Sequence, residues 1–108
     1  MRLMLGLSLC LALAAPAWAQ DAKVAKGKQL FTDQKCTLCH SVAAAGNKKG
    51  PLDDVGSKLA AADIKLWLTD TKAQIAKHKP TRKPEMKAYT LPAEDVDALV
   101  AYLSTLKK

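Results

Sequence analysis

The stretch Cys36-Thr37-Leu38-Cys39-His40 decides how this chain of 108 residues folds. Its C-x-x-C-H pattern is the attachment signature of c-type haem. Two thiols one helical turn apart can both reach the vinyl groups on one edge of the porphyrin, and the next residue then places an imidazole under the iron. The pattern therefore predicts one covalently bound haem c, with Cys36 and Cys39 as the attachment residues and His40 as an iron ligand.

Three other uses of the cysteine pair fit the sequence less well. A thioredoxin-like redox pair belongs to a βαβ context, which this sequence does not indicate. A zinc site needs two further ligands, and His78 provides only one. A local disulfide between Cys36 and Cys39 is the plainest alternative, because exported proteins commonly form disulfides. Haem attachment accounts for both cysteines and for the adjoining histidine.

Residues 1–19 have the pattern of a secretory signal peptide. Arg2 gives a short positive region, an apolar run follows it, and Ala17-Trp18-Ala19 is the small-x-small motif after which signal peptidase cleaves. An uncleaved membrane anchor is the alternative, but the run falls short of the roughly 18 apolar residues that a membrane span needs. We therefore expect cleavage after Ala19, a single domain over residues 20–108 and export to the periplasm.

The composition is typical of a small globular domain with a basic surface. Hydrophobic residues make up 49% of the chain, and 17 Lys+Arg outweigh 10 Asp+Glu to give a net charge of +7. At about 100–200 residues per domain, there is room for one domain only. Aromatic residues contribute just 5%, so a covalently held porphyrin would supply apolar mass that the core otherwise lacks. Nucleic acid is a poor partner for this chain, because export is expected and no recognition motif is present.

Apolar residues recur at helical spacing in three segments. The spacing predicts helices over Asp21–Asp33, over about Ala61–Thr71 and from Pro92 toward the C-terminal end. No β-alternation of useful length competes with them, and residues 43–58 and 76–92 are predicted as loops rich in Gly, Pro and Lys. We therefore expect an all-α fold of three to four helices around the haem.

Gly27 predicts a close contact between two helices. Glycine inside a helix is less favourable than alanine by up to about 1 kcal/mol. Its position on the apolar face of the first helix, beside Phe31, therefore indicates that a neighbouring helix comes close.

Met86 is the residue that we expect to complete the coordination of the iron. It is the only methionine outside the expected leader, and it lies in an extended segment restricted by Pro80 and Pro84. Its charged neighbours are poor surroundings for a core residue, and a thioether is an established axial ligand of haem iron. The alternatives are His78, which lies in a hydrophilic run typical of solvated surface, and an open sixth position.

Beyond these motifs, the chain resembles the small class I c-type cytochromes that carry one haem. The resemblance extends from about Val24 to Leu106. It implies the cytochrome c fold, Met86 as the sixth ligand, and contact between the first and last helices. Besides the haem motif, it rests on Gly27 and Phe31, Gly50-Pro51-Leu52, Met86 and Tyr89, and Leu99 and Tyr102.

The resemblance also implies two supporting roles. In the family, the backbone carbonyl of a proline after the haem motif accepts the ring N–H of the ligand histidine, and Pro51 is at the matching place. Trp67 would donate its indole N–H to a haem propionate. The plainer alternatives are an ordinary Gly-Pro turn at Pro51 and a core aromatic at Trp67.

Lysines flank the predicted haem ligands. Lys35 precedes Cys36, and Lys83 and Lys87 lie on either side of Met86. Around an exposed haem edge, such charges would steer docking to redox proteins with acidic patches. The plainer explanation is that the lysines keep a small protein soluble. Neighbouring loops add Lys48, Lys49 and Lys79.

Together these features predict a soluble periplasmic electron carrier rather than an enzyme. Such a protein needs a six-coordinate haem that alternates between Fe(II) and Fe(III) and an exposed haem edge, and we expect it to be a monomer without a membrane span. One alternative is a haem enzyme or gas sensor with an open or displaceable distal site, for which only His78 and Arg82 offer catalytic groups. Another is a dedicated electron-accepting subunit of one dehydrogenase.

Overall fold

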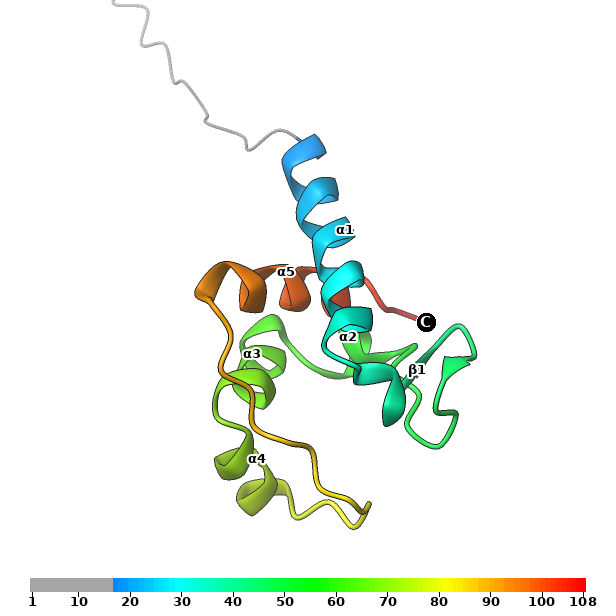
Figure 1. Cartoon of the computed structure of the whole chain (residues 1–108), viewed down its shortest axis with the longest axis vertical. Coiled ribbons are helices and arrows are strands. Elements are labelled where there is room, and N and C mark those ends of the chain that lie inside the picture. Colours follow the sequence, from blue (N-terminus) through cyan, green and yellow to red (C-terminus); the bar gives the residue numbers. More distant parts are fainter. Residues whose placement is uncertain (1–16) are drawn as a thin grey trace, which may run out of the picture.

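The computed structural model describes residues 17–108 as a helical domain (Figure 1). This confirms the all-α prediction. Over these residues there are five α-helices rather than three to four, because one extra helix is a single turn and the middle segment is divided in two. The elements in order are α1 (Ala17–Asp33), η1 (Cys36–Leu38), β1 (Ser41–Val42), β2 (Ala45–Gly46), α2 (Val55–Lys58), α3 (Ala61–Thr69), α4 (Thr71–His78) and α5 (Ala93–Ser104).

Most of the expected signal peptide, residues 1–16, lies outside the described residues. Residues 17–19 form the beginning of α1, so the expected cleavage point falls within the first turn of that helix. Within residues 17–108, none of the helices combines the length and the apolar composition needed to cross a membrane.

Helices α1 and α5 cross each other at Gly27 (Figure 1). A Cβ atom at Gly27 would collide with the backbone carbonyl of Ala98, so only glycine lets α5 come this close. Beside the crossing, the rings of Phe31 and Tyr102 meet edge to face with their centroids 5.9 Å apart. The predicted contact between the first and last helices is confirmed.

The first turn of α5 is also tied to α1 by charge. Glu94 and Asp95 lie in this turn, where carboxylates are stabilised by the positive end of the helix dipole. Nζ of Lys26 lies 3.1 Å from Asp95 and 3.6 Å from Glu94. These contacts, the hydrogen bond to Asp95 above all, raise the pKa of Lys26.

The middle segment differs from the predicted single helix over about Ala61–Thr71. Asp70 leaves the helical conformation (φ −138°, ψ 50°), so the segment forms α3 and α4, and α4 continues to His78. The buried side chains of α4 are the polar residues Thr71 and Gln74. Because hydrophobic periodicity does not register buried polar residues, the loop predicted over residues 76–92 begins three residues too early, and residues 79–92 form it.

The predicted loop over residues 43–58 contains two short regular elements, β2 and α2. Strands β1 and β2 pair antiparallel, with Ser41 opposite Gly46, and α2 adds one helical turn. Ser41 also forms an isolated bridge with Pro51. Elements this short show no hydrophobic periodicity in the sequence, because contacts with other segments determine their conformation.

The buried core lies where α1, α3 and α5 meet. Met86 packs against this core while partly buried, as do Leu52 and Val55. The core is therefore continuous with the segments that carry the predicted site. Its buried members are Phe31, Ile64, Leu68, Val96, Leu99, Tyr102 and Leu103.

Candidate functional site

The haem motif forms a tight turn directly after α1. Lys35 adopts the left-handed conformation (φ 58°, ψ 33°) immediately before η1. The backbone amides of Cys39 and His40 both donate to the carbonyl oxygen of Cys36, at 3.2 Å and 2.9 Å. Both thiols are free and half-buried. The turn thus gathers the two cysteines and the histidine into one short, internally hydrogen-bonded segment.

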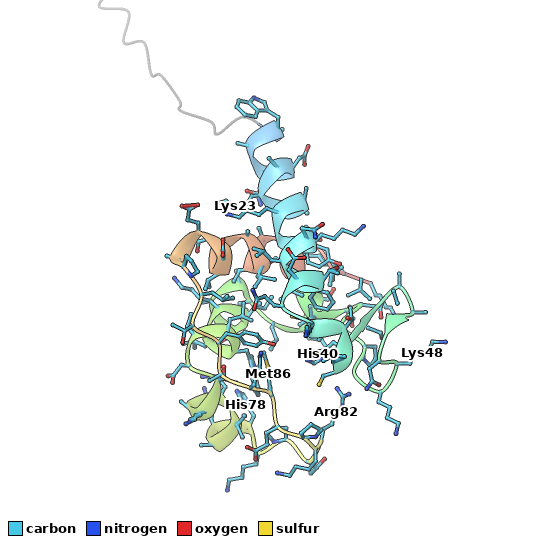
Figure 2. All side chains as sticks on the ribbon, viewed as in Figure 1. Lys23, His40, Lys48, His78, Arg82 and Met86 are labelled. Carbon is cyan, nitrogen blue, oxygen red and sulfur yellow. The ribbon has the colours of Figure 1, made fainter. Side chains whose placement is uncertain are left out.

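A cavity of about 600 Å³ adjoins this turn. Cys36, Cys39 and His40 line it from the turn, and Met86 lines it from the loop between α4 and α5. Figure 2 shows His40 and Met86 in the interior of the domain, on segments that approach from different sides. The rest of the wall is largely apolar and includes Phe31, Leu52, Val55, Leu59, Ile64, Trp67, Leu68, Ile75, Leu99 and Leu103.

These residues fit a covalently bound haem. The two thiols provide the attachment groups, and an imidazole and a thioether are both axial ligands of haem iron. An apolar wall of this extent suits the porphyrin plane. Among the described residues, no three His, Cys, Asp or Glu side chains are grouped to hold a bare metal ion. The donor set therefore suits a haem better than an isolated zinc ion.

The carbonyl oxygen of Gly50 holds the imidazole of His40. Nδ1 lies 3.0 Å from that oxygen, so Nδ1–H donates to it and Nε2 is left available to the iron. Burial lowers the pKa of His40, the hydrogen bond to Gly50 opposes this shift, and the charge of Arg82 adds to it. The imidazole is therefore neutral near pH 7, which is the form that binds a metal.

The expected role of Pro51 is wrong, because the acceptor is the preceding residue, Gly50. The amide of Ser41 also donates to the Gly50 carbonyl, at 3.1 Å, and the amide of Leu52 donates to the Ser41 carbonyl, at 2.9 Å. This pairing turns the Gly50 carbonyl toward the segment that carries His40. Pro51 itself is exposed and does not line the cavity, so the turn alternative suits it better.

Tyr89 connects the methionine segment to the haem motif. It lines the same cavity as Met86, and its hydroxyl lies against the thiol of Cys36. Burial, reinforced by the neighbouring Cys36, raises the pKa of Tyr89 to about 12. Burial also raises the pKa of Cys36, while the hydrogen bond from Tyr89 opposes that shift.

Trp67 and His78 stack on each other at one side of the cavity. Their ring centroids are 5.6 Å apart, with 27° between the planes. Trp67 is half-buried and lines the cavity, whereas His78 is exposed at the end of α4 and does not. Of the two candidates for the sixth ligand, only Met86 is therefore in the cavity wall.

The three lysines predicted to dock partners have different surroundings. Lys35 and Lys87 are exposed and lie at the cavity wall. Lys87 also lies over the Tyr89 ring, 5.0 Å from its centroid. Lys83 is exposed but does not line the cavity, and its Nζ pairs with Glu85 at 3.0 Å.

Three residues at the site were named in the sequence but were not predicted to bind the haem. Gly50 accepts the His40 hydrogen bond, and Arg82 and Tyr89 line the cavity. Arg82, the one arginine outside the expected leader, was considered only as a catalytic group of the alternative haem enzyme. Nothing in the sequence singles out the carbonyl of Gly50 over that of Pro51.

The fold and this site are typical of a haem-binding electron-transfer domain. The Cytochrome c family model matches residues 24–107. The chain therefore belongs to the cytochrome c family.

One relative is the cytochrome c oxidase subunit 2 of Alkalihalophilus pseudofirmus, which is 28% identical over 91 residues. The match covers 76% of this chain and 25% of the relative, so the chain spans about a quarter of that protein's length. No solved structure gives a significant match.

Proposed function

We propose that this chain is an exported electron carrier that binds one haem c. Cys36 and Cys39 attach the haem, and His40 and Met86 are its axial ligands. When bound, the haem supplies an iron that accepts and releases one electron. The observation that supports this proposal is the meeting of two thiols, an imidazole and a thioether at one largely apolar cavity.

The protein groups favour a stable site for electron transfer rather than for substrate binding. The hydrogen bond to Gly50 fixes the ring of His40. Thioether ligation by Met86 raises the reduction potential relative to two histidines. The apolar wall acts in the same direction, because it disfavours the additional positive charge of ferric iron.

Partner docking is proposed to occur at the cavity mouth. Lys35 and Lys87 place positive charge there, and Leu38 between the two cysteines is 69% exposed. An apolar contact beside positive charges suits a redox protein with an acidic patch. The positive charge of this surface would also accelerate the encounter with such a partner.

Carbon monoxide binding tests this function. The mature, haem-loaded protein is reduced with dithionite, exposed to carbon monoxide and followed by its visible spectrum. A carrier with Met86 on the iron keeps its spectrum, and Met86→Ala serves as the open-site control that forms a carbonyl complex. Rapid formation of that complex by the unmodified protein would instead favour a haem enzyme or a gas sensor.

Export and haem content are tested by the mass of the protein from the periplasmic fraction. We expect a chain that begins at Gln20 and carries the mass of one haem. A chain that still includes residues 1–19, or one recovered only from the cytoplasm, would contradict the proposed export.

A second candidate is a dedicated electron-transfer component of one terminal oxidase. The similarity to an oxidase subunit 2 favours it. After detergent extraction of membranes from the source cells, a dedicated component would elute with the oxidase at physiological salt. A diffusible carrier would elute at its own mass.

A further inference from the structure

Arg82 links the loop that carries Met86 to the loop that holds His40. A Cβ atom built on Gly50 would lie 2.8 Å from Cζ of Arg82, would collide with Nη1 of the same guanidinium, and would also overlap the carbonyl oxygen of Cys39. The guanidinium therefore occupies space that is open only because residue 50 is glycine. Figure 2 shows the Arg82 side chain extending from its loop toward the His40 side of the domain.

The charge of Arg82 is not held by a carboxylate. Over residues 17–108, the ion pairs are those of Lys26 and Lys83, and Arg82 is in neither set. Yet Arg82 is half-buried at the wall of a largely apolar cavity. Partial burial of an unpaired cation is unfavourable, so the packing of the guanidinium against Gly50 has to account for its position.

The segment that carries Met86 depends on side-chain contacts of this kind. Residues 80–91 contain no helix or strand. Among the backbone hydrogen bonds of the described residues, none joins residues 80–91 to another part of the chain. Arg82 lies four positions before Met86, and the Gly50 that it contacts is also the residue that binds the His40 ring.

We propose that Arg82 is a positioning residue that fixes the Met86 segment against the His40 segment and so slows the release of Met86 from the iron. This inference rests on the proposed ligation by His40 and Met86. The planar guanidinium fills the space beside Gly50, and a lysine side chain has neither the shape nor the donor arrangement to replace it.

Displacement of methionine by imidazole in the ferric, haem-loaded protein tests the proposal. At saturating imidazole the observed rate reaches a limit set by dissociation of Met86, which is a readout independent of electron transfer. We expect Arg82→Gln to raise this limiting rate about threefold to tenfold, the effect of losing one packing contact of moderate strength. Arg82→Lys should raise it nearly as much, and Lys77→Gln, an exposed site away from the cavity with the same change in charge, should leave it unaltered.

Three results would overturn the inference. One is a limiting rate in Arg82→Gln equal to that of the unmodified protein. Another is an equal acceleration in Lys77→Gln, because the loss of any positive charge would then suffice. The third is full retention of the slow rate in Arg82→Lys, because a side chain without a planar group would then hold the segment equally well. If Arg82→Gln fails to bind haem, the limiting rate of Arg82→Lys alone tests the inference, since this variant keeps the charge.

Failure of the proposed ligation gives a different result. If Met86→Ala and the unmodified protein bind imidazole at the same rate with no limit, Met86 is not the ligand, whatever the Arg82 variants do. A rate limit that disappears in Met86→Ala but does not change in Arg82→Gln contradicts only the positioning role of Arg82.

Discussion

Gly27 in α1 lies directly against the backbone carbonyl of Ala98 in α5, with no room for a side-chain carbon between them. This contact is where the two terminal helices cross, and the edge-to-face pair of Phe31 and Tyr102 adjoins it. Since Phe31 also lines the cavity, the crossing supports the candidate haem site as well as the core.

The Gly27→Ala variant is expected to unfold more easily. Its gain in helix propensity is at most about 1 kcal/mol, whereas overpacking would force the helix backbones apart. We expect a net loss of about 1–3 kcal/mol in the free energy of unfolding, measured by urea titration of the haem-loaded protein. Lys28→Ala, an exposed site on the same helix, should change it by less than about 0.5 kcal/mol. An unchanged or higher urea midpoint for Gly27→Ala would show that α5 can move away without cost.

Replacement of Met86 by alanine is expected to lower the reduction potential. The thioether favours ferrous iron, and its loss lets water approach the site. A decrease of at least about 59 mV, equivalent to a tenfold change in the one-electron equilibrium, should appear in a redox titration. His78→Ala is the matched control, because His78 lies outside the cavity wall and should not affect the potential. The reverse order of effects would assign the sixth position to His78.

Reversal of charge at the cavity mouth is expected to slow electron exchange with an acidic partner. Lys35→Glu and Lys87→Glu should each decrease the second-order rate roughly tenfold at low salt. The rates should converge toward that of the unmodified protein as ionic strength rises, because the screening length falls to about 10 Å at 0.1 M. Lys72→Glu, an exposed site on α4, is the control for net charge. Equal slowing by all three variants would mean that overall charge, and no localised surface, guides docking.

The phenol of Tyr89 is expected to resist ionisation. Its pKa in the folded protein is about 12, above the usual value of 10, because burial disfavours the phenolate. The unfolded chain therefore loses this proton first, and stability should fall as the pH rises from about 10 to about 12. Tyr89→Phe should remove that part of the pH dependence, measured by urea unfolding at several pH values. A phenolate absorbance from Tyr89 that titrates near pH 10 in the folded protein would contradict the burial.

The sequence was informative wherever the determining interactions are local. The C-x-x-C-H motif closes within five residues through hydrogen bonds to the Cys36 carbonyl, and hydrophobic periodicity located α1, α3 and α5. Gly27 was recognised because glycine inside a helix needs a reason, which the close approach of α5 provides. Met86 could be selected as the expected ligand because the chain offers so few alternatives.

Tertiary structure alone decided which groups meet across separate segments. Backbone hydrogen bonds join Ser41 to Gly50 and Leu52, and the carbonyl of Gly50, rather than that of Pro51, accepts the hydrogen bond from the His40 ring. The break at Asp70 turns one predicted helix into two, and buried polar residues extend the second. The position of Arg82 against Gly50 leaves no pattern in either segment. The physical reason is range: helix periodicity and turn hydrogen bonds depend on neighbours within a few residues, whereas a carbonyl's direction or a guanidinium's place depends on backbone brought together from distant parts of the chain.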